Sequence, residues 1–253
     1  MGTFGVITQS VIPLREEDCH KSQMVSQLLF GEAVEVLQVR EEWLYVKNIA
    51  DGYLGWIEQK QFTFLEKAEF DQWVGMKKSV VALPIATIER KNDQTPMMIP
   101  AGSDIAGDNS FTIGNNSFLH NFSFSSSRAI SEIALQFMNV PYLWGGKTVF
   151  GFDCSGFVQT VFKIAGIALP RDAFQQAELG KVVDFLQEVQ PGDLAFFHNA
   201  EERITHVGII LSPTKIIHCS GSVRIDNIDH QGIFNVSLGK YTHPLRVVKR
   251  IKS

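Results

Sequence analysis

The chain has 253 residues, of which 45% are hydrophobic and 20% charged, and its formal charge is -4 at pH 7. This composition is typical of a globular protein with a sizeable core, and it excludes a disordered or fibrous chain. Lysine and arginine number 23 against 27 acidic residues and form no basic block, which argues against a nucleic-acid-binding protein.

Three cysteines, Cys19, Cys154 and Cys219, cannot all pair with one another, and neither a Cys-x-x-Cys nor a His-Glu-x-x-His spacing occurs. We therefore expect a reduced chain with no metal and no cofactor.

No apolar run reaches the roughly 18 residues of a membrane helix, and the first ten residues lack the pattern of an export signal. We expect a cytoplasmic protein without a membrane partner. The alternative is a periplasmic or secreted protein from which an export signal has been removed.

The N-terminal half is predicted to be rich in strands. Short β-branched and aromatic runs occupy positions 31–39, 43–47 and 53–57, and turn-forming pairs separate them. They predict a small β-barrel over residues 1–70. Prolines and glycine or asparagine turn signals then recur and exclude a long helix. We expect a second small β-barrel over residues 71–125.

The hydrophobic period changes after the serine run Ser123–Ser127. One helical stripe covers residues 128–139, and a second helix is predicted from Cys154 to Ala165. Helices followed by strands predict an α+β domain with an antiparallel sheet over residues 126–253. Its strands are predicted at positions 194–197, 205–211, 215–220 and 245–251.

Cys154 is the candidate nucleophile. It opens the second predicted helix within Asp153-Cys154-Ser155-Gly156, where unsatisfied backbone N–H groups and the helix dipole favour a negative charge. We expect its thiol to ionise more readily than an ordinary one, which is how a cysteine becomes a nucleophile at neutral pH. Taken alone, a cysteine is more often a buried core residue.

Two histidines accompany this cysteine on a predicted hairpin. The turn Ser212-Pro213-Thr214 is expected to pair Leu211 with Lys215 and to set Gly208 opposite His218. His206 and His218 would then share one face of the sheet, the geometry that a Cys-His-His catalytic set needs. The other histidines are interpreted as structural or surface residues: His20, His120, His198, His230 and His243.

Five segments resemble, in order, the signatures of the NlpC/P60 cysteine peptidases. They are Trp144 to Lys147, Gly151 to Phe157, Leu169 to Asp172, Gln190 to Leu194 and Thr205 to Ile210. The resemblance covers residues 126–253. It implies a papain-like α+β fold that hydrolyses peptidoglycan peptides, with Cys154 as nucleophile, His206 as base and His218 as third member.

The N-terminal half resembles bacterial SH3 domains in residues 31–37 and 43–56. Two SH3-like domains ahead of an NlpC/P60 domain are similar to the γ-D-glutamyl-L-diamino acid endopeptidases, in which the first SH3 domain closes one end of the groove. The resemblance implies cleavage of the bond between γ-D-Glu and a diamino acid, either meso-diaminopimelate or lysine. The substrates would be peptidoglycan-derived peptides with a free N-terminal L-Ala, which suits cell-wall recycling.

The same resemblance assigns substrate-binding roles. Glu17, Tyr53 and Asp172 would hold the substrate ammonium, whereas Ser155 and Arg171 would face the D-glutamyl carboxylate. Trp144 and Asp153 would line the groove. These residue types suit the task, because acids bind an ammonium and arginine binds a carboxylate in bidentate fashion. The alternatives are that Tyr53 and Trp144 are core residues, that Asp153 is only a helix cap and that Glu17 is a solvated acid.

One departure from the family is Ala173, where these relatives commonly carry a serine. Losing one neutral hydrogen bond, worth about 1 kcal/mol, predicts weaker binding or looser selectivity rather than a different reaction.

The sequence does not indicate which diamino acid follows the scissile bond, and we expect a monomer. Two other functions stay open: an exported wall-lytic endopeptidase, and a catalytically silent protein that binds the wall through its SH3 domains.

Overall fold

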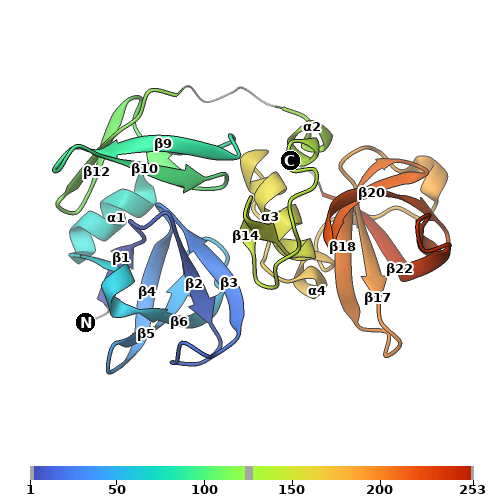
Figure 1. Cartoon of the computed structure of the whole chain (residues 1–253), viewed down its shortest axis with the longest axis horizontal. Helices are drawn as coiled ribbons and strands as arrows, with labels where there is room; N and C mark the ends of the chain where they lie inside the picture. Colours follow the sequence, from blue (N-terminus) through green and yellow to red (C-terminus); the bar gives the residue numbers. More distant parts are fainter. Residues whose placement is uncertain (1–2, 123–127, 252–253) are drawn as a thin grey trace. The chain divides into compact units, whose positions relative to one another are not determined.

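The computed structural model describes residues 3–122 and 128–251. The chain divides into two compact units, residues 1–126 and 127–253 (Figure 1). The predicted boundary at Ser123–Ser127 lies outside the described residues. Within the described ranges, no helix combines the length and apolar character that a membrane span requires.

The N-terminal unit begins with a seven-stranded antiparallel sheet in the order β3-β2-β6-β5-β4-β1-β7. All three strands predicted in this region are present, as β4, β5 and β6. Alternate residues such as Val34 and Val36 on β4 are buried, which is the pattern of a sheet with one face on a core. The elements are β1 (Thr3–Val6), β2 (Val11–Arg15), β3 (Met24–Leu29), β4 (Ala33–Arg40), β5 (Trp43–Asn48), β6 (Leu54–Glu58), the 3₁₀ turn η1 (Gln59–Gln61) and β7 (Thr63–Leu65).

A helix that the sequence pattern did not reveal follows this sheet. Helix α1 (Lys67–Gly75) starts at a capping box formed by Glu66 and Glu69, and the predicted domain boundary at residue 70 falls inside it. Only Phe70 and Trp73 are buried on α1, so its apolar stripe is too short to stand out in the sequence.

The remaining strands of this unit form one sheet in the order β10-β9-β13-β12 and a two-stranded pair, β11 with β8. One core cluster joins Val6 and Phe30 of the first region, Trp73 of α1 and Phe118 of the second region. The strands are β8 (Lys78–Val80), β9 (Ile85–Arg90), β10 (Thr95–Pro100), β11 (Asp104–Ala106), β12 (Ser110–Ile113) and β13 (Asn116–Leu119).

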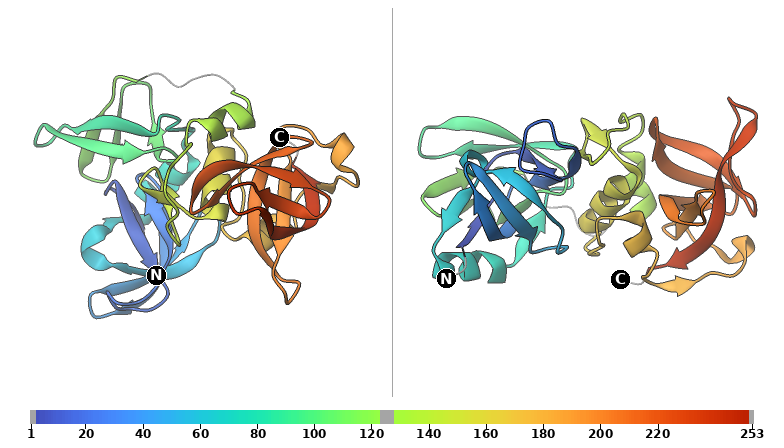
Figure 2. Two further views of the ribbon diagram at one scale, coloured as in Figure 1. Left: turned by 45° about the vertical axis from the view of Figure 1, so that its right-hand side comes forward. Right: turned by 90° about the horizontal axis from the view of Figure 1, so that it is seen from below.

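The C-terminal unit combines a strand barrel with three short helices. Strands β17 to β22 pair in sequence, and β22 also pairs with β17, which closes a six-stranded antiparallel barrel with β16 at its edge. The helices gather on one side of the barrel strands in every view (Figures 1 and 2), and α3 packs on β18 and β19. The elements before the barrel are α2 (Ile130–Leu135), β14 (Lys147–Thr148), β15 (Gly151–Phe152), α3 (Cys154–Ile164), α4 (Ala173–Gln176), β16 (Lys181–Val182) and the 3₁₀ turn η2 (Leu186–Glu188).

Residues from all six barrel strands share one apolar cluster, which is therefore the barrel's interior: Ala195, Phe197, Ile210, Ile216, Ile228, Ile233 and Val248. The four predicted strands of this region are confirmed, and α3 begins where predicted. Helix α2 is shorter than expected, and β20 and β21 were not predicted. The barrel strands are β17 (Leu194–His198), β18 (Ile204–Ser212), β19 (Lys215–Ser220), β20 (Ser222–Asp229), β21 (Gly232–Asn235) and β22 (Lys240–Arg250).

Trp73 tests the shared core of the N-terminal unit. Its side chain is 2% exposed, and its Nε1 donates a hydrogen bond to the Gly31 carbonyl at 2.9 Å. Trp73→Ala is expected to lower the free energy of unfolding of this unit by about 3–5 kcal/mol, measured by urea denaturation followed by far-UV circular dichroism. The matched control is Trp144→Ala, because Trp144 is 58% exposed and its loss should cost no more than about 0.5 kcal/mol. Equal losses in the two variants would contradict the assignment.

Candidate active site

Cys154 is the first residue of α3, and the turn before it is fixed by a buried aspartate. The Asp153 carboxylate accepts hydrogen bonds from the backbone N–H groups of Gly156, at 2.6 Å, and Gly145, at 2.9 Å. A Cβ placed on Gly156 would lie 2.2 Å from the Gly146 carbonyl oxygen, so the loop and the helix approach as closely as glycine allows. The Cys154 sulfur lies 3.8 Å from the carbonyl oxygen of Thr205, directly beside His206 on β18.

The ionisation expected of Cys154 is corrected by the structure. The residue is 8% exposed. Burial, with the Asp153 charge as the next contribution, raises the pKa of the Cys154 thiol to about 11. Asp153 caps α3, so its negative charge lies beside the sulfur and opposes ionisation of the thiol. The thiol is therefore neutral in the free protein.

The hairpin brings the two predicted histidines together. His206 Nε2 and His218 Nδ1 are 2.9 Å apart, within hydrogen-bond distance. Gly208 lies opposite His218, as predicted, but Ser212 rather than Leu211 pairs with Lys215. A bulge at Leu211 and a shorter turn compensate for each other, so the predicted face is correct although the predicted end of the hairpin is wrong. A Cβ on Gly208 would lie 2.8 Å from His218 Cβ, so this glycine leaves room for the imidazole.

Both imidazoles occupy the interior side of the barrel. His206 and His218 have the same strand alternation as Ile210 and Ile216 of the interior cluster, and they are 6% and 1% exposed. Burial lowers the pKa of His206 well below its ordinary value, and His218 and His243 act in the same direction. His206 is therefore neutral, and a neutral imidazole has a lone pair that can accept a proton.

The hydrogen-bond chain continues beyond the predicted set. His218 Nε2 lies 3.0 Å from Asp226 Oδ2, and Asp226 Oδ1 accepts a hydrogen bond from Arg224 at 2.9 Å. His243, interpreted above as a structural or surface residue, stacks on His206 with ring centroids 4.1 Å apart. The sequence carried little signal for either residue, because β20 was not predicted and because the pairing that places His243 joins distant strands.

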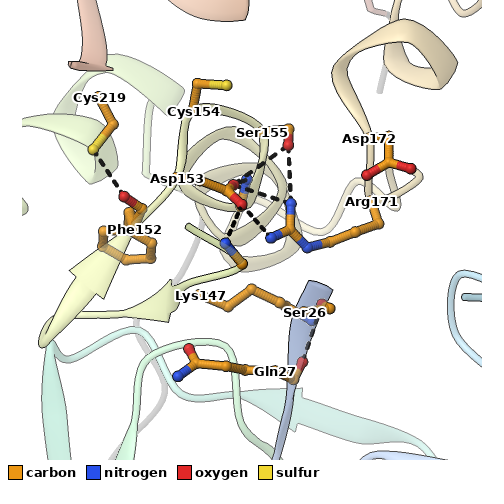
Figure 3. Close-up of polar contacts among 12 residues, drawn as sticks. Ser26, Gln27, Lys147, Phe152, Asp153, Cys154, Ser155, Arg171, Asp172 and Cys219 are labelled. Carbon is orange, nitrogen blue, oxygen red and sulfur yellow. Dashed lines mark hydrogen bonds and ion pairs between the residues drawn. The ribbon is translucent and has the colours of Figure 1, made fainter. Parts of the chain in front are cut away.

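Arg171 is placed differently from its predicted role. Its side chain is 1% exposed and forms a bidentate ion pair with Asp153, while Nη1 also donates to Ser155 Oγ at 2.9 Å (Figure 3). The guanidinium is thus bound inside the protein, and direct bidentate contact with a substrate carboxylate would break a buried ion pair. We correct the expectation for Arg171: it holds Asp153 and Ser155. The role of Ser155 toward a carboxylate stays a prediction.

The other predicted binding residues are distributed over both units. Asp172 caps α4 in a capping box, and Trp144 is exposed before α3. Glu17 is exposed and Tyr53 half-buried, and both belong to the N-terminal unit. The roles assigned to these four residues stay predictions. Ala173, where relatives commonly carry a serine, is buried at the start of α4.

Tyr142 is a further residue of the site that sequence reasoning missed. Burial raises the pKa of Tyr142 to about 12, and the neighbouring Cys154 and Asp153 act in the same direction. Its phenol therefore keeps its proton at neutral pH.

Two family models match parts of this chain. Residues 139–240 match the model of the NlpC/P60 family, and residues 14–62 match that of the bacterial dipeptidyl-peptidase Sh3 domain. The chain is 31% identical over 226 residues to the gamma-D-glutamyl-L-lysine dipeptidyl-peptidase of Bacillus subtilis (strain 168), an alignment that covers 79% of this chain and 73% of that protein. It is 26% identical over 247 residues to dipeptidyl-peptidase 6 of Lysinibacillus sphaericus, covering 85% and 88%.

A solved structure shares the fold. The crystal structure of an NlpC/P60 family protein from Bacillus cereus ATCC 10987 aligns with 98% of this chain and 99% of its own, with a TM-score of 0.79 at 21% identity.

The histidine cluster predicts how stability depends on pH. Burial lowers the pKa of His243 from 6.5 to about 4, so between these values the unfolded chain binds more protons than the folded chain. The free energy of unfolding should therefore fall as the pH is lowered from about 6.5 toward 4. His243→Phe and His243→Gln should both make this fall shallower in urea titrations at several pH values, and an unchanged slope would contradict the argument. His243→Phe keeps an aromatic ring without a titratable nitrogen, whereas His243→Gln removes the ring as well. The pair therefore separates loss of the proton-binding site from loss of ring stacking.

Proposed function

The chain belongs to the NlpC/P60 family of cysteine peptidases, and we propose that it hydrolyses the bond between γ-D-glutamate and the following diamino acid in peptidoglycan-derived peptides. The observation that carries the proposal is the contact of the Cys154 sulfur with β18 beside His206, which is itself hydrogen-bonded to His218. The two curated relatives described above are dipeptidyl-peptidases, one of them named for γ-D-glutamyl-L-lysine.

The geometry supports the following chemistry. His206 accepts the thiol proton as the Cys154 sulfur attacks the carbonyl carbon of the γ-glutamyl amide. The C–N bond of the tetrahedral intermediate then breaks, and His206 returns the proton to the leaving amine of the diamino acid. Water attacks the resulting thioester, again losing a proton to His206, and the thiol is regenerated as the acyl group leaves as a carboxylate. The start of α3 provides a positive partial charge next to the carbonyl oxygen.

The N-terminal regions are proposed to complete the enzyme. The match of residues 14–62 to a dipeptidyl-peptidase Sh3 domain supports an SH3-like domain in residues 1–70, and residues 71–125 are proposed as a second one. We propose that Glu17, Tyr53 and Asp172 bind the free ammonium of the substrate's L-alanine. A preference for a free amine would restrict the enzyme to released peptides. Such a restriction would suit the proposed role of this papain-like peptidase in cytoplasmic recycling.

A pair of defined tripeptides tests the proposal. L-Ala-γ-D-Glu-L-Lys or its meso-diaminopimelate counterpart should yield L-Ala-γ-D-Glu and the free diamino acid, detected by mass spectrometry. The N-acetylated copy should have a kcat/KM at least about 30-fold lower, the equivalent of about 2 kcal/mol for an uncompensated charged pocket. Similar values for the two peptides would favour the wall-lytic alternative. Absence of cleavage by the folded protein would favour the silent wall-binding alternative.

Variants of the catalytic set give a second, independent test. Cys154→Ala should abolish cleavage, and His206→Ala should lower kcat by at least about 100-fold, the usual scale for a general base. His218→Ala should retain more activity than His206→Ala, because it orients the base rather than transferring the proton. The matched control is Cys219→Ala, which removes a buried thiol that donates to the Phe152 carbonyl (Figure 3). Greater loss of activity at Cys219 than at Cys154 would overturn the assignment of the nucleophile.

A further inference from the structure

The hydrogen-bond chain behind the candidate base ends on a buried carboxylate. The side chains of His218 and Asp226 are 1% and 5% exposed and form a contact of 3.0 Å through Nε2 and Oδ2. On the far side of Asp226, Arg224 lies within 2.8 Å of Oδ2 and is 34% exposed. One carboxylate thus joins the interior of the barrel to a partly solvated arginine.

Resting on the proposed cysteine peptidase function, we infer that Asp226 is a positioning residue, which fixes the tautomers of both histidines and so decides which nitrogen of His206 acts as the base. A carboxylate accepts hydrogen bonds and has no proton to donate. The proton in the contact between Asp226 and His218 therefore belongs to His218 Nε2. A neutral imidazole has a single N–H, so Nδ1 of His218 is an acceptor.

The same reasoning applies to the imidazole ring of His206. His206 Nε2 faces His218 Nδ1 at 2.9 Å, and because that nitrogen of His218 is an acceptor, His206 Nε2 must be the donor. The lone pair of His206 then lies on Nδ1. The opposite order of donors would place a proton on Nδ1 and leave His206 unable to accept one from the Cys154 thiol there.

The surroundings of Asp226 favour the ionised carboxylate. Burial alone would raise the pKa of Asp226, but hydrogen bonds from His218 and Arg224 outweigh burial and keep this pKa below its usual value. When His206 gains the thiol proton, the negative charge on Asp226 stabilises the resulting imidazolium through His218. Asp226 itself does not take up a proton in this step.

Asparagine at position 226 offers one acceptor oxygen where two are needed. If that oxygen faces His218, the amide N–H₂ group meets the Arg224 donor. If it faces Arg224, the N–H₂ group donates to His218 Nε2 and reverses both tautomers. Either arrangement weakens the order of donors that Asp226 imposes.

The control is a second buried carboxylate in the same barrel. Asp193 is 2% exposed and accepts two hydrogen bonds from Arg250 at 2.8 Å. Asp193→Asn therefore breaks a comparable carboxylate–arginine pair in a place with no hydrogen bond to either histidine among the described residues. It measures the purely structural cost of the substitution.

The experiment combines ¹⁵N NMR of histidine-labelled full-length protein with tripeptide kinetics. In the unmodified protein His206 should show a protonated Nε2 and an unprotonated Nδ1, and the reverse would overturn the inference without any variant. Asp226→Asn should shift Nδ1 of His206 toward the protonated range and lower kcat by roughly 10-fold or more, with KM changed less than about twofold. Asp193→Asn should lower the melting temperature but preserve the tautomers and kcat.

Two outcomes of the variants would overturn the inference: unchanged tautomers and kcat in Asp226→Asn, or an equal loss of kcat in Asp193→Asn. Failure of the proposed function is distinguishable from these. If the unmodified protein cleaves neither tripeptide, the peptidase proposal fails, whereas the NMR result needs no substrate and still reports on the role of Asp226.

Discussion

The pairing of β18 with β19 is the constraint on which the candidate site depends. It sets Gly208 against His218 and brings His206 within hydrogen-bond distance of that ring. A slip of one residue would turn one histidine to the other face of the sheet and separate the rings. The bulge at Leu211 interrupts the pairing at the end of the hairpin, whereas the register from Gly208 to Ile210 is regular.

A second constraint is the buried ion pair between Asp153 and Arg171. Removing two charges from water is costly, and here the cost is offset by a bidentate geometry and by the backbone donors of Gly145 and Gly156. The pair fixes the loop before α3 to the segment that leads into α4. It also places a negative charge beside Cys154, so the same interaction that positions the sulfur opposes its ionisation.

The sequence was sufficient for features that depend on local spacing. The start of α3 at Cys154 and the shared face of His206 and His218 follow from short-range periodicity, and both are present. Two residues of the hydrogen-bonded and stacked cluster were missed. Asp226 lies on β20, a strand that was not predicted although it pairs with the adjacent β19, and His243 lies on β22, which pairs with the distant strand β17. The direction of the Cys154 pKa was also wrong, because it depends on how deeply the helix start is buried and on the orientation of the Asp153 carboxylate.

Burial of both partners has a consequence for how the thiolate forms. With the pKa of Cys154 raised and that of His206 lowered, transfer of the proton from sulfur to nitrogen is unfavourable before substrate is present. Coupling the proton transfer to attack on the carbonyl carbon, when the negative charge moves from the sulfur to an oxygen, would avoid forming this unfavourable ion pair.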